Sequence, residues 1–427
     1  MMIHKICYNL FFIASISFSQ NYTEYATGST TDITTNHSFG ICMMGGSSEN
    51  DNAMRWFLNK TDGGDIVVLR ASGSDGYNDY MYSKLGVAIN SVTTFVIHNK
   101  DGAIDPYVLN KVTNAEGIWF AGGDQFNYVN YFKDNAMEDA LNAFINTKKG
   151  VIGGTSAGMA ILGNYYFDAA NGSVTSEQAL ENPYTARISL GYNDFLDIPF
   201  LESIVTDTHY DARGRRGRHS VFLARFATDN SMRSFGIACN ERTAVCIDNN
   251  GKASVFGSYP NHDSYAYFLQ ANCTENFDPE TCVASTPLTW DRNDEAIKVY
   301  KVSGNNTGEN YFDLSDWNTG SGGIWENWYV ENGNFFNEGA TNPNCILSIE
   351  ESQLNNVSIY PNPFADVVNI ETNSKNVKLQ LFDINGKELE AKFNKSNQLN
   401  TKNLASGVYF LKLKLENGEQ TFKLIKE

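Results

Sequence analysis

The sequence lacks a long apolar run, an internal repeat and any pair of cysteines or histidines at metal-ligand spacing. No segment is apolar for the roughly 20 residues that a membrane-spanning helix needs, which argues against an integral helical membrane protein. The lack of a Cys-x-x-Cys pair or of paired histidines argues against a metal site. We therefore predict neither a metal centre nor a cofactor.

Positive charge is also scarce. The chain has 32 Lys and Arg against 49 Asp and Glu, which gives a formal net charge of −17 over 427 residues. A chain with this negative charge repels nucleic acid and anionic membranes, whereas it attracts a cationic or arginine-bearing substrate. With 42% hydrophobic residues it can fill a core, and its length suffices for two or three domains.

The N-terminus has the pattern of a signal peptide over residues 1–19. Lys5 supplies the positive end, and Ile6–Phe18 is mostly apolar and is followed by the small residue Ser19. We therefore expect a secreted protein, or one attached to the outer cell surface by something other than a helix. Residues 20–36 are rich in Thr, Asn and Ser and are predicted to be a flexible lead-in.

Six cysteines remain once the signal peptide is removed. An even number in an oxidising compartment permits disulfides. Cys273 and Cys282 are predicted to pair and close a small loop. Cys239 and Cys246 flank a short apolar run, where buried thiols are an equally good interpretation.

Apolar strands alternate with helical segments over most of the range 37–345. Strands of this kind are predicted at 65–72, 92–99 and 117–125. Because continuous apolar strands separated by helices form parallel sheets covered on both faces, the range is assigned to one α/β domain. Functional residues gather at the carboxyl ends of such strands. Glycine turns mark three of those ends, after Met44, Ala121 and Ile152.

The segment 151–163 carries the pattern on which the functional prediction rests. It places Gly-Thr-Ser-Ala-Gly between an apolar strand and an apolar helix. A Gly-x-Ser-x-Gly turn in that position lifts a serine hydroxyl clear of the sheet, which makes Ser156 a candidate nucleophile. A glycine-rich turn with a capping serine is the simpler alternative.

A serine hydroxyl needs a base, and the base needs an acceptor that orients it. Among the five histidines outside the signal peptide, His209 follows an apolar strand and lies amid dense polar residues. Glu241 comes just after a further apolar strand and is the candidate acceptor. A structural histidine and an exposed glutamate in a turn are the alternatives. The order Ser, His, Glu differs from the Ser, Asp or Glu, His order of α/β-hydrolases.

Three motifs together resemble those of cyanophycinases and their aspartyl-dipeptidase relatives. They are Gly-Gly-Asp-Gln at 122–125, Gly-Thr-Ser-Ala-Gly-Met at 154–159 and Asp-Thr-His-Tyr-Asp-Ala-Arg-Gly-Arg-Arg-Gly-Arg at 207–218. The resemblance covers roughly Phe39 to Val330. It implies an α/β fold with a doubly wound, mostly parallel sheet of the flavodoxin-like, class I glutamine amidotransferase-like type.

The resemblance also implies a role for each matching residue. Ser156 matches the nucleophile, His209 the general base and Glu241 the acid that orients it. The residues that match oxyanion donors are Gly123, Asp124 and Ala157. The residues that match substrate-binding positions of the cyanophycinase branch are Gln125, Asp207, Arg213, Arg215 and Arg218. Arg216 and Arg218 are also compatible with a helix surface, and Arg213 with an internal pair to Asp207 or Asp211.

The range 357–427 has short alternating strands with turn signals and predicts a small all-β sandwich. It resembles the C-terminal sorting domain of proteins exported by the type IX secretion system of Bacteroidetes. The motifs that match are Tyr360-Pro361-Asn362-Pro363, Asp383-x-x-Gly386-Lys387, Leu404-x-x-Gly407-x-Tyr409 and Lys423-Leu424-Ile425-Lys426. The resemblance implies that the secretion machinery is a partner and that the domain is commonly cut off or attached to the cell surface. The range 346–356 is predicted to be a linker.

These observations predict a secreted serine hydrolase that cleaves β-aspartyl-arginine isopeptide bonds, as found in cyanophycin. An aspartyl dipeptidase or a broader isopeptidase is the first alternative. An inactive surface-binding protein on the same fold is the second. The sequence leaves open whether the chain forms a homodimer and whether the C-terminal domain is removed.

Overall fold

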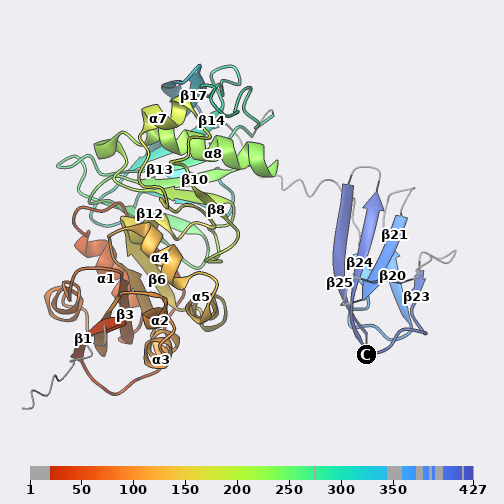
Figure 1. Ribbon diagram of the computed structural model, residues 1–427, viewed down its shortest axis with the longest axis horizontal. Helices are drawn as coiled ribbons and strands as arrows, with labels where there is room; N and C mark the ends of the chain where they lie inside the picture. Colours follow the sequence, from red (N-terminus) through yellow and green to blue (C-terminus); the bar gives the residue numbers. More distant parts are fainter. Residues whose placement is uncertain are drawn as a thin grey trace, which may run out of the picture. The chain divides into compact units, whose positions relative to one another are not determined.

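A computed structural model describes residues 20–273, 276–343, 358–371, 378–383, 387–389, 398–415 and 418–426. The chain divides into two compact units, Met1–Ile346 and Leu347–Glu427 (Figure 1). The predicted signal peptide, 1–19, and the predicted linker, 346–356, lie outside the described residues. Within the described residues no helix is both long and apolar enough to cross a membrane.

The first unit contains a ten-stranded sheet in the order β1-β4-β3-β5-β6-β2-β11-β12-β15-β16. Its strands are β1 Tyr22–Gly28, β2 Gly40–Met44, β3 Asp65–Arg70, β4 Ser91–Ile97, β5 Gly117–Phe120, β6 Val151–Thr155, β11 Ala244–Ile247, β12 Lys252–Phe256, β15 Tyr311–Asp313 and β16 Gly320–Ser321. The five strands from β4 to β2 are parallel. Strands β4-β3-β5-β6 follow the 2-1-3-4 order of a flavodoxin-like sheet, and β2 takes the fifth position. The predicted fold class is confirmed.

Helices cover both faces of this sheet. The α-helices of the described residues are α1 Asp51–Lys60, α2 Lys100–Ala103, α3 Pro106–Asn114, α4 Gln125–Phe132, α5 Ala136–Ala143, α6 Ala157–Ala160, α7 Ser176–Glu181 and α8 Arg216–Asn230. Asn50 caps α1 by accepting hydrogen bonds from the first turn. The buried residues of α1, such as Phe57 and Leu58, pack on Val68 and Trp119 of the sheet. In Figure 1, α1 lies on one face of the sheet and α3 and α5 on the other.

A second sheet of eight strands completes the first unit, in the order β18-β17-β14-β13-β10-β9-β7-β8. Its strands are β7 Tyr165–Phe167, β8 Leu190–Tyr192, β9 Ile204–Asp207, β10 Phe235–Cys239, β13 Tyr265–Ala271, β14 Ile297–Ser303, β17 Gly323–Glu331 and β18 Asn334–Ala340. Only the pairs β7–β9 and β9–β10 are parallel. Helices α7 and α8 contribute to its aromatic core, which includes Phe222, Tyr267 and Trp328. The aromatic segment 258–344 supplies four of its strands, β13, β14, β17 and β18.

The prediction of a flexible lead-in over 20–36 is wrong for residues 22–28. This segment forms β1, which pairs antiparallel with β4 from Tyr22 opposite Ile97 to Gly28 opposite Ser91. Its residues are only partly buried, as expected of an edge strand. Because an edge strand buries one face at most, its composition remains polar and resembles that of a loop.

The predicted disulfide between Cys273 and Cys282 is also wrong. Cys282 is a free, buried thiol in the core of the second sheet, whereas Cys273 is disulfide-bonded. Thr281 pairs with Thr289 as an isolated bridge, and the adjoining thiol of Cys282 lies beside Thr228 and Tyr184. Burial raises the pKa of the Cys282 thiol, which therefore packs as a small apolar side chain.

The second unit is a small sandwich of two antiparallel sheets, as predicted. The strands of the three-stranded sheet are β19 Ser358–Tyr360, β20 Val367–Glu371 and β23 Gln398–Asn400; those of the four-stranded sheet are β21 Lys378–Asp383, β22 Glu388–Leu389, β24 Gly407–Leu415 and β25 Gly418–Lys426. Val368 and Leu399 from the first sheet share one core with Leu411 and Leu424 from the second. The unit therefore has a hydrophobic core of its own.

Candidate active site

Strands from both sheets of the first unit end at one place, where three predicted residues meet. Ser156 follows β6, His209 follows β9 and Glu241 follows β10. Ser156 Oγ lies 2.8 Å from His209 Nε2, and His209 Nδ1 lies 2.7 Å from Glu241 Oε1. A hydroxyl, an imidazole and a carboxylate are thus joined in series by hydrogen bonds.

The backbone of Ser156 has φ 52° and ψ −115°, a conformation that L-residues rarely adopt. This turn joins β6 to α6 and raises the hydroxyl above the sheet edge. Glycine is required on either side of this turn, because a side chain at Gly154 or Gly158 would collide with the neighbouring backbone. A Cβ on Gly154 would lie 2.6 Å from the backbone of Gly158, and one on Gly158 would lie 2.2 Å from the carbonyl oxygen of Phe120.

The glycine turn after β2 holds His209 in place through a hydrogen bond and close packing. His209 has φ 46°, and its N–H donates a 2.8 Å hydrogen bond to the carbonyl oxygen of Gly45. A Cβ on Gly46 would lie 2.5 Å from the imidazole ring. The turn between Met44 and Ser47 therefore gives the imidazole both an anchor and the space that it occupies.

The hydrogen bonds fix the tautomer of His209. A carboxylate only accepts hydrogen bonds, so Nδ1 carries the proton toward Glu241 and Nε2 is free to accept from the Ser156 hydroxyl. Burial lowers the pKa of His209, the hydrogen bond to Glu241 opposes this, and the charges of Arg213 and Arg215 lower the pKa further. The net direction is downward, so the imidazole is neutral and able to accept a proton at neutral pH.

Two of the three predicted oxyanion residues border the space beside Ser156. Gly123, which follows β5, and Ala157, the first residue of α6, line the pocket there. The N–H of Ala157 belongs to the first turn of a helix, where backbone donors have no intrahelical acceptor. Asp124 is not among the lining residues. Its side chain caps α4 by accepting a 3.0 Å hydrogen bond from the N–H of Phe126.

The pocket beside Ser156 has a volume of about 60 Å³ and contains all five predicted substrate-binding residues. Asp207 is buried and accepts two hydrogen bonds from Arg218, of 2.8 and 2.6 Å, and one of 3.2 Å from Arg215. Burial alone would raise the pKa of Asp207, but the two guanidinium groups hold it at about 2. The carboxylate is therefore charged, and it fixes both arginines.

The remaining members of the arginine-rich motif have separate roles. Arg213 is exposed and makes no side-chain hydrogen bond or ion pair with the described residues, so its guanidinium is available to a ligand. Arg216 instead bonds Asp211 and lies over the rings of Tyr267 and Trp328. Gln125 Nε2 lies 3.4 Å from the carbonyl oxygen of Phe167 on the pocket wall.

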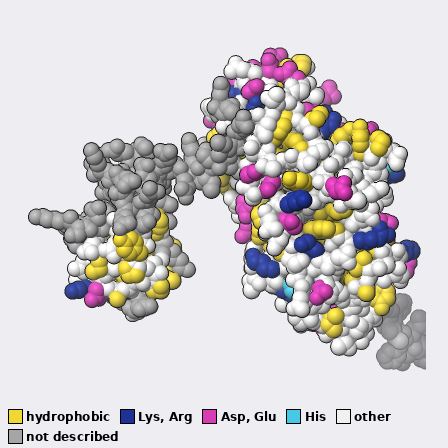
Figure 2. Space-filling view, turned by 180° about the vertical axis from the view of Figure 1, so that it is seen from behind, with side chains coloured by type: hydrophobic (Ala, Val, Ile, Leu, Met, Phe, Trp, Pro, Cys, Tyr) yellow, Lys and Arg dark blue, Asp and Glu magenta, His cyan; other side chains and the backbone are white. Residues whose placement is uncertain are grey.

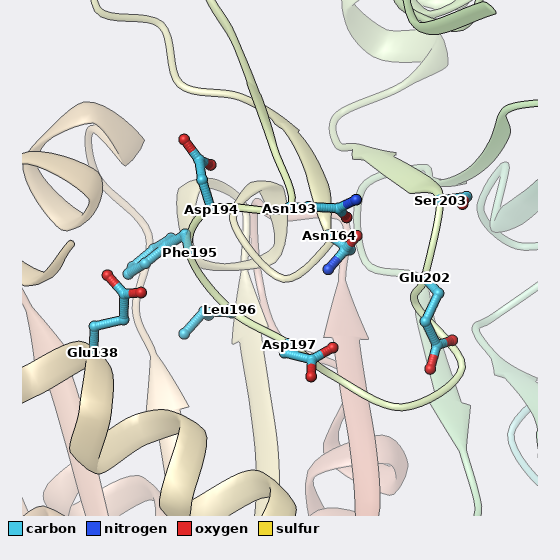
Figure 3. Close-up of a pocket in the computed structure, with 9 residues that line it drawn as sticks. All are labelled: Glu138, Asn164, Asn193, Asp194, Phe195, Leu196, Asp197, Glu202 and Ser203. Carbon is cyan, nitrogen blue, oxygen red and sulfur yellow. The ribbon is translucent and has the colours of Figure 1, made fainter. Parts of the chain in front are cut away.

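A second, larger pocket of about 450 Å³ lies between α5 and the chain that follows β8 (Figure 3). Its acidic residues are Glu138, Asp194, Asp197 and Glu202. Figure 3 shows the carboxylates of Asp194 and Glu202 pointing away from one another, and Asp194 is paired with Lys133. The pocket contains no predicted site residue and no convergent set of ligands.

One group of acidic side chains elsewhere in the described residues is close enough to share a cation. The carboxylate oxygens of Asp291, Asp294 and Glu331 lie within 4.8 Å of one another. Asp294 and Glu331 are exposed, and none of the three lines the pocket beside Ser156. The group has no connection to the Ser156 site.

Two parts of the chain match models of known protein families. Residues 74–255, which include Ser156, His209 and Glu241, match the model of peptidase family S51. Residues 358–427 match the model of the secretion system C-terminal sorting domain. Two separate parts of the chain are thus similar to two family models, that of a peptidase and that of a C-terminal sorting domain.

Individual relatives are distant. Cyanophycinases of Synechococcus elongatus and Thermosynechococcus vestitus are each 22% identical to this chain over 171 residues, which is 40% of this chain and 48% of theirs. The chain therefore spans about half the length of these curated relatives. A solved peptidase from an acI-B1 Actinobacterium is 13% identical, with a TM-score of 0.40 over 56% of this chain and 96% of that chain.

Proposed function

We propose that the protein is a secreted serine-type hydrolase that cleaves β-aspartyl-arginine isopeptide bonds through an acyl-enzyme on Ser156. The hydrogen-bonded series of Ser156, His209 and Glu241 is the observation that carries the proposal. It supplies a nucleophile, a base and an orienting carboxylate at the contact distances that acyl transfer requires.

The proposed reaction begins when Ser156 Oγ attacks the amide carbonyl and His209 Nε2 takes the hydroxyl proton. Glu241 stabilises the imidazolium that forms. Backbone N–H groups of Ala157 and of the Gly123 turn donate to the oxyanion. His209 then gives the proton to the leaving amine, and water, deprotonated by the same imidazole, releases the acyl group.

The charge of the pocket supports an acyl group with a free carboxylate. Three guanidinium groups face one carboxylate there, which leaves a net positive charge beside Ser156. Guanidinium groups recognise carboxylates through paired hydrogen bonds, and a 60 Å³ pocket suits a side chain as short as that of aspartate. The net charge of −17 favours a cationic group, such as arginine, on the leaving side.

The basic side chains are local features of an acidic protein. Figure 2 shows Lys and Arg in a band across one face of the first unit, with Asp and Glu interspersed among them and gathered at one end of that face. The alternative functions remain an aspartyl dipeptidase or broader isopeptidase, and an inactive surface-binding protein. Because the sorting domain indicates export through the type IX system, we infer that the substrate is met outside the cell.

The test is incubation of the secreted protein with cyanophycin and with α- and β-aspartyl dipeptides, with products identified by mass. We expect β-aspartyl-arginine from the polymer, and none from Ser156→Ala. Turnover of dipeptides alone would favour the dipeptidase. If no substrate is cleaved and a fluorophosphonate fails to label Ser156, the chain is a binding protein and the proposal is wrong.

A further inference from the structure

His209 and Glu241 reach one another from two separate segments of the chain, and the position of Glu241 depends on its backbone. The Glu241 side chain is 36% exposed, and within the described residues the only hydrogen-bond partner of its carboxylate is His209. Nothing else on the side chain holds the carboxylate in place. The segments that carry the two residues must therefore be fixed relative to one another by their neighbours.

Asn240 joins those segments directly. Its Oδ1 accepts a 3.1 Å hydrogen bond from the N–H of Asp211, and its Nδ2 donates a 2.9 Å hydrogen bond to Asp211 Oδ2. Nδ2 also donates to the carbonyl oxygen of Asp263 at 2.8 Å. The amide is 3% exposed, so water does not compete for these bonds. Asp211 is two residues after His209, and Asn240 is next to Glu241.

The carboxylate of Asp211 is itself immobilised. Arg216 Nε donates to Oδ1 at 2.8 Å, and the hydroxyl of Tyr267 donates to Oδ2 at 2.6 Å. Arg216 also donates to the Tyr267 hydroxyl and lies over the Tyr267 ring, 5.0 Å from its centroid. Burial alone would raise the pKa of Asp211, but the hydrogen bonds from Arg216, Tyr267 and Asn240 lower it. The carboxylate is therefore an anion that accepts from all three side chains.

We propose that Asn240 and Asp211 are positioning residues for the reaction of the Ser156 site. Their reciprocal hydrogen bonds set the distance and direction between His209 Nδ1 and Glu241 Oε1. They touch neither substrate nor the reacting atoms. The inference rests on the proposed function for its kinetic consequence, but the geometry of the His209–Glu241 hydrogen bond can be measured without any substrate.

The first test removes the amide with Asn240→Ala. We expect kcat to fall about 10- to 100-fold, because displaced supporting groups misalign a catalytic hydrogen bond. KM should change less than about two-fold, since the pocket arginines keep their partners. A looser bond to Glu241 lowers the pKa of His209, so the acid limb of kcat/KM should move to lower pH.

The matched control is Asn272→Ala. Asn272 is 1% exposed, and its amide donates to the carbonyl oxygen of Glu295 at 2.9 Å, at the end of β13 remote from His209. This variant also loses a buried amide, but kcat and the acid limb should stay as in the wild type. Equal kinetic losses in both variants would mean that Asn240 has a merely structural role, which would overturn the proposal.

A reciprocal exchange provides rescue. Asn240→Asp sets two carboxylates against one another and should lower kcat at least as much as Asn240→Ala. Adding Asp211→Asn restores one amide and one carboxylate across the gap, and we expect at least about five-fold recovery of kcat. A double variant no better than Asn240→Asp alone would contradict the reciprocal bond as the operative contact.

A proton NMR measurement separates this inference from the proposed function. The proton between His209 Nδ1 and Glu241 should give a low-field signal in the wild type that weakens or shifts in Asn240→Ala and not in Asn272→Ala. An unchanged signal in Asn240→Ala overturns the inference. If the wild type cleaves no substrate but the signal still changes in Asn240→Ala as expected, only the proposed function is overturned.

Discussion

At the scale of single residues, His209 is under opposing electrostatic influences. Burial and the neighbouring charges of Arg213 and Arg215 disfavour its protonated form, and Glu241 favours it. The balance keeps Nε2 available to the Ser156 hydroxyl, 2.8 Å away. Substituting an arginine should therefore raise the pKa of His209, whereas substituting Glu241 should lower it.

We predict that Arg213→Gln moves the acid limb of kcat/KM to higher pH. Removing a positive charge near the imidazole raises the pKa of His209, so the base becomes protonated at a higher pH than in the wild type. KM for an aspartyl substrate should rise about 10-fold or more, because a charged hydrogen-bond donor is lost. A pH–rate profile of both enzymes measures this, and a shift to lower pH would contradict it.

Glu241→Gln should have the opposite effect on the pH profile. Losing the carboxylate lowers the pKa of His209 and moves the acid limb to lower pH. The rate should also fall by about 10²- to 10⁴-fold, since the imidazolium is no longer stabilised and the tautomer is no longer fixed. Steady-state kinetics with a β-aspartyl dipeptide test both parts. A loss in KM alone, with kcat unchanged, would mean that Glu241 acts on binding.

The sequence predicted individual site residues where a pattern marks a strand end. Ser156 lies in a recognisable strand–turn–helix pattern, and His209 follows an apolar strand. The separate tasks of Arg213, Arg215 and Arg216 could not be predicted, because they depend on how one turn directs each side chain. Asn240 was missed altogether, since nothing in a single sequence distinguishes a clamping asparagine from one on the surface.

At the scale of elements, the turn after β2 is as important to the site as the strands that carry the side chains. We predict that Gly46→Ala lowers kcat about 100-fold, because a Cβ there would lie 2.5 Å from the imidazole and force it away from Ser156. Gly86→Ala is the control. Gly86 also has a positive φ, but a Cβ there meets nothing within 4 Å. Similar losses of kcat in both would attribute the effect to backbone strain.

The helix α8 carries a buried histidine that links stability to pH. The carbonyl oxygen of Val205 only accepts, so His219 Nε2 donates to it at 3.1 Å, and Nδ1 accepts from the Tyr210 hydroxyl at 3.0 Å. His219 is therefore neutral. Burial lowers its pKa from 6.5 to about 4.

Because the unfolded chain binds this proton more tightly than the folded one, His219 should destabilise the fold as pH falls from 6.5 to 4. Its contribution is fully present above pH 6.5, and about 3 kcal/mol is lost by pH 4. Urea unfolding of the wild type and of His219→Gln at several pH values measures this. The variant should show a smaller decrease with acidification, and parallel curves would contradict the assignment.

Elements were predicted best where they are apolar and regular. The parallel strands and their glycine turns are visible in the sequence, because buried strands read as continuous apolar runs. The joining of β13, β14 and β17 into a separate sheet could not be predicted, because long connections separate these strands along the chain and their aromatic residues also suit loops. The edge strand β1 was missed for a similar reason, since its exposed face keeps it polar.

At the scale of the whole molecule, the two units are separate in both core and chemistry. Every predicted site residue lies between Gly123 and Glu241 in the first unit, and the second unit has its own core around Leu411. We therefore predict that a chain ending at residue 346 keeps kcat/KM within about two-fold of the full protein. The two units should also unfold in separate transitions in calorimetry, as independent domains do.

The control for this truncation is Ser156→Ala in the full chain, which keeps both transitions but loses activity. If removing Leu347–Glu427 instead lowers kcat or shifts the transition of the first unit, the second unit takes part in the folding or function of the first. If both are unchanged, the second unit serves export alone. Its removal after secretion would then leave the Ser156 site intact, because Ser156, His209 and Glu241 all belong to the first unit.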